Sequence, residues 1–96
     1  MTTRANIIVL GDIVFSVMSD GYPDEVIPFL LEIAKKCKNE KEFIGELTIE
    51  SNEGDWLEMG KVAYPDYEYT IDFGTRTITY EEEYDDGKLI EKSIKF

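Results

Sequence analysis

The sequence predicts a single α+β domain, in which an antiparallel sheet of five to six strands carries one long and one short helix on one face. Three observations predict this class: an apolar N-terminal hairpin, a segment of helical periodicity after it, and three alternating segments that end the chain. The 96 residues are enough for one core, and contents of 43% hydrophobic and 12% aromatic residues are typical of a folded globule. We therefore expect residues 1–96 to form one domain.

The N-terminal hairpin is predicted from two short apolar segments. Ala5 to Leu10 is apolar on both faces, as expected of a central strand. Gly11 and Asp12 interrupt the apolar run, and Ile13 to Met18 continues it with apolar residues on both sides. We expect the two strands to pair.

A long helix is predicted after the turn at Ser19 to Pro23. Asp24 is a candidate N-cap, and Glu25 places a negative charge in the first turn, where the helix dipole favours it. Three lysines crowd the other end of the segment, where the dipole favours cations. The apolar residues recur at the spacing of a core-facing stripe: Val26, Phe29, Leu30, Ile33, Ala34 and Cys37.

A short second helix is predicted to begin at Asn39–Glu42, which resembles a capping box. It continues through Phe43, Ile44 and Leu47, and residues 50–55 then read as a polar turn. Trp56 to Met59 is a candidate short strand, followed by a loop.

The C-terminal third of the chain is predicted to be a three-strand meander over Tyr67–Phe73, Thr75–Tyr84 and Lys88–Phe96. Aromatic and branched residues alternate with polar ones, which is the period of a half-buried strand. Gly74 marks the first turn and Asp85-Asp86-Gly87 the second. This folding would gather carboxylates on one face of the sheet and its rim: Glu68, Asp72, Glu81, Glu83, Asp85 and Asp86.

The formal charge of −11 lies almost wholly after Asn39. Residues 40–60 carry one basic and seven acidic side chains, and residues 61–96 carry five and nine. A protein so charged repels nucleic acid and anionic lipid, so we expect it to bind neither directly. A basic protein or nucleoprotein complex is the natural partner.

Several residue types that carry chemistry are absent or isolated. The chain has no histidine, and Cys37 is its single cysteine, which excludes an internal disulfide and suits a reducing cytoplasm. Neither a signal peptide nor a membrane span is visible. We expect a cytoplasmic protein that is not an enzyme and binds no metal or cofactor.

Three short motifs resemble those of a group of small phage and prokaryotic proteins. The chain opens Met1-Thr2-Thr3-Arg4, places Asp20-Gly21-Tyr22-Pro23 before its first helix, and carries Tyr69-Thr70-Ile71-Asp72 in an aromatic-rich strand. The group shares these features over much of the chain and has no assigned activity. Val17, Met18 and Ser19 stand where such proteins often place His and Trp, so histidine chemistry is not implied here. The resemblance implies a viral or mobile-element origin.

The Asp20-Gly21-Tyr22-Pro23 corner has two interpretations. Arg4 and Asp20 could meet across the hairpin and form a small-ligand or enzymatic site with Tyr22. Alternatively, Arg4 and Asp20 form a structural ion pair, and Gly21-Tyr22-Pro23 shapes the turn.

The leading functional hypothesis is a small acidic protein that inhibits a basic host defence or nucleic-acid-processing protein by charge mimicry. Anti-CRISPR and anti-restriction proteins act in this way. Carboxylates in rows along strands repeat at roughly 6.5–7 Å, an interval comparable with that of a nucleic-acid backbone. We expect a monomer, or a homodimer joined through the strand edge at Lys88–Phe96. Besides the sheet face, a second acidic patch is predicted: Glu53, Asp55 and Glu58.

Overall fold

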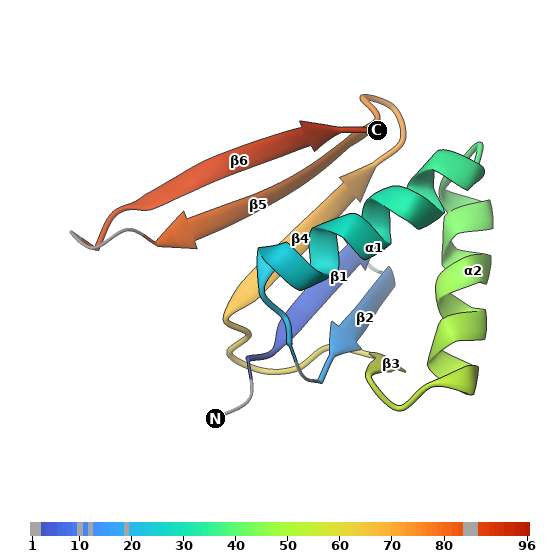
Figure 1. The fold of residues 1–96 in the computed structure, drawn as a ribbon, viewed down its shortest axis with the longest axis horizontal. Helices are drawn as coiled ribbons and strands as arrows, with labels where there is room; N and C mark the ends of the chain where they lie inside the picture. The colour runs from blue at the N-terminus through green and yellow to red at the C-terminus, as the bar shows by residue number, and fades with distance from the viewer. Residues whose placement is uncertain (1–2, 10, 12, 19, 84–86) are drawn as a thin grey trace.

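The computed structural model describes residues 3–9, 11, 13–18, 20–83 and 87–96, without the side chain of Glu83. It has a six-stranded sheet in the order β3-β2-β1-β4-β5-β6 and two helices, which confirms the predicted α+β class (Figure 1). The elements in chain order are β1 (Ala5–Val9), β2 (Ile13–Val17), α1 (Pro23–Lys36), α2 (Glu40–Glu53), β3 (Leu57–Met59), β4 (Tyr67–Asp72), β5 (Thr77–Glu83) and β6 (Leu89–Lys95).

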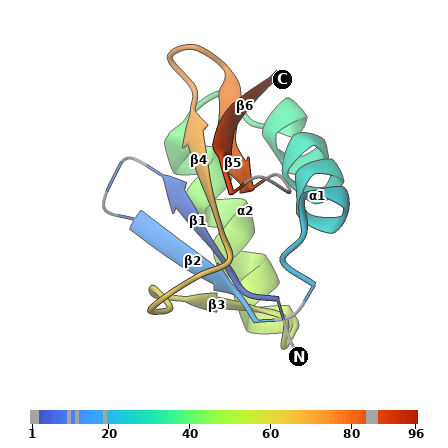
Figure 2. The ribbon, with the colours of Figure 1, turned by 90° about the vertical axis from the view of Figure 1, so that its left-hand side faces the viewer.

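The sheet is mostly antiparallel, and its one parallel junction lies at the centre. The predicted hairpin β1–β2 and the predicted meander β4–β5–β6 both form. They join where β1 and β4 run parallel, with Ile7 beside Tyr69. The two ends of the chain are thereby brought into one sheet, and both helices lie on the same face of it (Figures 1 and 2).

Helix α1 begins two residues earlier than its predicted N-cap implies. Pro23 occupies the first helical position, where its missing N–H costs nothing and its φ suits a helix. Tyr22 is the N-cap residue, and Asp24, which was predicted there, lies in the first turn. The carbonyl of Tyr22 accepts from the N–H groups of Glu25 and Val26 at 3.0 Å, so backbone contacts close this end of the helix.

Helix α2 is as long as α1, because residues predicted to form a polar turn continue it to Glu53. Its start follows the prediction: Asn39 Oδ1 accepts from the Glu42 N–H at 3.0 Å, and Glu42 Oε1 accepts from the Lys38 N–H at 2.8 Å. The hydroxyls of Thr48 and Ser51 donate to the carbonyls of Ile44 and Thr48 in the preceding turn, so both hydroxyls are satisfied within the helix.

The core fills the space between the helices and the inner face of the sheet. Its largest fully buried side chains include Tyr69, Phe15 and Phe43. Cys37 is also buried, and burial raises the pKa of its thiol. The predicted placement of Cys37 in the core is thus confirmed.

The outer face of the sheet is covered over only part of its area. Asn6 of β1 points to this face, yet it is fully buried, since its amide exchanges hydrogen bonds of 3.1 and 3.0 Å with the backbone of Val62. The segment between β3 and β4 crosses this face (Figure 2). The side chains of Glu68, Thr70 and Glu81, on β4 and β5, are exposed beyond it.

The β5–β6 hairpin extends beyond the rest of the sheet (Figure 1). Phe96 is half-buried and packs against Phe73 and under the guanidinium of Arg76. The predicted homodimer through the β6 edge would be supported by an exposed Phe96. Because Phe96 packs within its own chain, its position gives that dimer no support. No helix among the described residues is long and apolar enough to cross a membrane.

Candidate functional site

The sheet splits between β4 and β5. Their ladder contains Thr70–Thr79, Ile71–Ile78 and Asp72–Thr77 and stops there. Residues 67–69 remain paired with β1 on the other side, and residues 80–83 with β6. The two strands therefore present unpaired backbone edges to each other across a gap.

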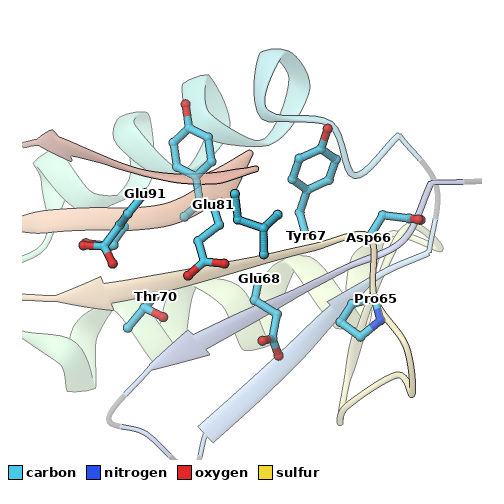
Figure 3. A pocket seen from close by; sticks show the side chains of 10 residues that line it. Pro65, Asp66, Tyr67, Glu68, Thr70, Glu81 and Glu91 are labelled. Carbon is cyan, nitrogen blue, oxygen red and sulfur yellow. The ribbon is translucent and has the colours of Figure 1, made fainter. Parts of the chain in front are cut away.

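A cleft with a volume of about 410 Å³ lies at this split, and we call it the acidic cleft (Figure 3). It is lined by residues of β4, β5 and β6 and of the loop before β4. The lining residues are Pro65, Asp66, Tyr67, Glu68, Thr70, Thr79, Tyr80, Glu81, Leu89 and Glu91.

Three of the carboxylates around the cleft come from adjacent strands. Glu81 lies directly opposite Glu91 in the β5–β6 ladder. Continuing the β4–β5 register by two residues would place Glu68 opposite Glu81. Like charges opposed across strands are destabilising, so their repulsion favours an open ladder at this point. Glu68 and Glu81 project to one side of the sheet and Tyr67 to the other (Figure 3).

Tyrosines pack on the inner side of the split. The ring centroids of Tyr69 and Tyr80 are 5.5 Å apart, and those of Tyr67 and Tyr69 are 6.2 Å apart and stacked. Burial, followed by the charge of Glu82, raises the pKa of Tyr67. Glu82 itself forms a 2.7 Å ion pair with Lys92 on the inner side of the β5–β6 hairpin. On the outer side, Glu81 faces another carboxylate, that of Glu91.

The predicted acidic sheet face is formed in part. Glu68, Asp72 and Glu81 are exposed on its outer side, as the alternation predicts. Asp72 lies away from the cleft, and its Oδ1 accepts from the N–H of Gly74 at 2.7 Å, which stabilises the turn. Three further predicted residues have side chains outside the described part of the chain: Glu83, Asp85 and Asp86.

The predicted second acidic patch is divided between surfaces. Glu58 lies on the outer face, opposite Ser16, whereas Glu53 ends α2 on the other side of the sheet and Asp55 is in the loop after it. The acidic surplus therefore occupies two surfaces rather than one. Helix α2 has one cationic side chain, Lys41, and five carboxylates: Glu40, Glu42, Glu46, Glu50 and Glu53.

Sequence reasoning omitted Glu91 and Leu89 from the candidate site. The alternation of the last strand already placed Glu91 on the outer side, but its position opposite Glu81 depends on the β5–β6 register. Leu89 is 63% exposed and adds an apolar contact at the cleft. No local pattern indicates that β4 and β5 separate beside it.

The Asp20-Gly21-Tyr22-Pro23 corner is tightly packed. A Cβ at Gly21 would lie 3.0 Å from backbone atoms of Thr3 and Arg4, and the carbonyl of Gly21 accepts a 2.7 Å hydrogen bond from Tyr69. These contacts support a structural role for the turn.

Arg4, Asp20 and Tyr22 have separate surroundings. The backbone N–H of Arg4 donates to Asp66 Oδ2 at 3.0 Å. The ring of Tyr22 packs beside that of Tyr67, with the ring centroids 6.1 Å apart. Asp20 lines a pocket beside α1. No ion pair between Arg4 and Asp20 is found among the described residues.

The described residues contain no group of three or more His, Cys, Asp or Glu side chains arranged to hold a metal ion. No protein-family model, curated protein or solved structure matches the chain. The case for a function therefore depends on the geometry and charge of the acidic cleft.

Proposed function

We propose that this chain is a non-enzymatic binding protein whose acidic cleft takes up a cationic segment of another protein. The observation that carries the proposal is the placement of Glu68, Glu81 and Glu91 on three adjacent strands around a cleft with unpaired strand edges. The carboxylates select positive charge, and the strand edges offer backbone hydrogen bonds to an extended chain.

The charge distribution of the outer face supports a cationic partner. Among the described residues of its strands, five side chains are acidic and one is basic, Lys95. Opposed carboxylates cost stability in the free protein, and a cationic partner would offset that cost on binding. The acidic residues are Glu58, Glu68, Asp72, Glu81 and Glu91.

The partner class that we propose is a basic host protein of defence or nucleic-acid processing, inhibited by charge mimicry. Such proteins carry cationic grooves that track a phosphate backbone. Neighbouring strands lie about 4.8 Å apart, so carboxylates on adjacent strands form a row of closely spaced negative charges, as phosphates do along a nucleic-acid backbone. The resemblance to phage proteins supports a viral or mobile-element origin, and with it an anti-CRISPR or anti-restriction role.

The test compares two variants with the same net charge. Glu68→Lys with Glu81→Lys changes the cleft, and Glu46→Lys with Glu53→Lys changes exposed positions of α2. Immobilised wild type and both variants are incubated with lysate of a prokaryotic host in low and high salt. Captured proteins are identified by mass spectrometry, and their displacement by duplex DNA is measured.

We expect a basic protein to bind the wild type and the α2 variant, to bind the cleft variant at least tenfold less, and to be displaced by salt and by DNA. Salt sensitivity follows from screening of an electrostatic contact. Equal loss of binding in both variants would show that total charge, and not the cleft, attracts the partner. That result would overturn the proposal.

A further inference from the structure

A second pocket lies between the start of α1 and Trp56, and it shares no lining residue with the acidic cleft. Its volume is about 250 Å³, below the roughly 300–1,000 Å³ of pockets that hold drug-sized ligands. This size suits a single functional group. The pocket is lined by Asp20, Glu25, Val26, Phe29 and Trp56.

The aromatic wall of this pocket is held in place by several contacts. The rings of Phe29 and Trp56 meet edge to face, with centroids 4.6 Å apart and planes at 85°. The carbonyl of Trp56 accepts a 2.9 Å hydrogen bond from the N–H of Met18. A Cβ at Gly54 would lie 3.0 Å from Cδ1 of the indole, so the indole rests against glycine backbone.

Both charged residues of the lining are acidic. Asp20 comes from the loop before α1, where it adopts a φ of 56°, and Glu25 comes from the first turn of the helix. Neither forms a salt bridge within the described residues. Two exposed carboxylates beside two aromatic rings repel an anion and attract a cation.

We infer that this pocket binds an organic cation, namely an alkylammonium or guanidinium group of the kind that ends a lysine or arginine side chain. The half-buried rings of Phe29 and Trp56 contact the alkyl part, while the exposed carboxylates of Asp20 and Glu25 contact the charge. The inference is independent of the acidic cleft, because the two sites share no lining residue.

Trp56 is the single tryptophan of the chain, so its fluorescence reports on this pocket directly. The probe is n-butylguanidinium, and n-butylurea is its uncharged counterpart of similar shape. We expect a saturable change in Trp56 fluorescence with n-butylguanidinium and at least tenfold weaker binding of n-butylurea. A tripeptide with a central arginine provides a third probe. Tighter binding of the tripeptide supports a polypeptide as the natural source of the cation, and weaker binding supports a free small molecule.

The paired variant Asp20→Asn with Glu25→Gln removes the charge with little change in shape. Asn tolerates a positive φ as well as Asp does, so the backbone at position 20 is not strained further. The matched control, Asp24→Asn with Glu53→Gln, removes two exposed carboxylates outside the pocket. We expect at least tenfold loss of n-butylguanidinium binding in the first variant and none in the control.

Two results would overturn the inference. One is equal affinity for n-butylurea and n-butylguanidinium, which would make the pocket merely apolar. The other is full retention of n-butylguanidinium binding by the variant without Asp20 and Glu25 carboxylates. Circular dichroism of each variant distinguishes loss of the site from loss of the fold.

Discussion

The hydroxyl of Tyr69, on β4, donates a 2.7 Å hydrogen bond to the carbonyl of Gly21 in the loop before α1. The two residues are 48 positions apart, and both are buried. This bond ties the centre of the sheet to the start of the first helix and satisfies a carbonyl that water cannot reach.

Replacing Tyr69 by Phe should lower the free energy of unfolding by about 1–3 kcal/mol, because the Gly21 carbonyl would remain buried without a donor. Urea denaturation measures the change. Tyr64→Phe is the control, since Tyr64 is 96% exposed and its change should stay within about 0.5 kcal/mol. Equal stability of wild type and Tyr69→Phe would contradict the importance of this bond.

Stability should fall in alkali, and part of the fall should depend on Tyr69. Burial raises the pKa of Tyr69 above its ordinary value of 10.0, so the unfolded chain loses this proton first as the pH rises. The contribution is therefore complete below pH 10.0 and decreases above it. Urea titrations between pH 8 and 11 should show a shallower decline in Tyr69→Phe than in wild type, and parallel curves would refute this assignment.

Two Gly→Ala substitutions should have opposite effects. At Gly21 the new Cβ meets backbone atoms of Thr3 and Arg4 at 3.0 Å and would force them apart, so we expect a loss of about 1–3 kcal/mol. At Gly45, inside α2, no atom among the described residues lies within 4 Å of a Cβ beyond the helix's own backbone. There, alanine should stabilise the fold by about 0.5–1 kcal/mol. Thermal and urea unfolding of both variants would check the signs.

Glu81→Lys should stabilise the free protein, because it replaces a pair of opposed carboxylates, Glu81 and Glu91, by an opposite-charge pair. The expected gain in unfolding free energy is about 0.2–1 kcal/mol, decreasing in high salt. Glu46→Lys changes the net charge equally on exposed α2 and serves as the control. An equal gain in both variants would attribute the effect to net charge alone.

The thiol of Cys37 should react with a soluble disulfide reagent at least about tenfold more slowly in the folded protein than in urea. Burial, followed by the charges of Glu46 and Glu42, raises the pKa of this thiol and reduces the reactive thiolate. Absorbance of the released thiolate measures the rate. Equal rates in the two states would show that Cys37 is accessible.

Local patterns predicted the elements and their inner and outer sides. The period-two alternation from Tyr67 onward correctly assigned Tyr69 and Ile71 to the core and Glu68 to the outer face. The predicted turn at residues 50–55 was wrong for 50–53, which continue α2, and Gly54 and Asp55 leave the helix. Short polar side chains such as those of Ser51 and Asn52 favour turns locally, and the local pattern does not contain the tertiary packing that keeps them helical here.

The sequence by itself determined that this protein has an apolar hairpin, an amphipathic helix and a meander with an acidic side, because side-chain periodicity records which face each element buries. Only the tertiary structure decided that β1 lies parallel to β4, that β4 and β5 separate after Thr70–Thr79, and that Glu68, Glu81 and Glu91 surround one cleft. These relationships join residues far apart in the chain, and strand register together with side-chain packing determines them, which no local pattern encodes.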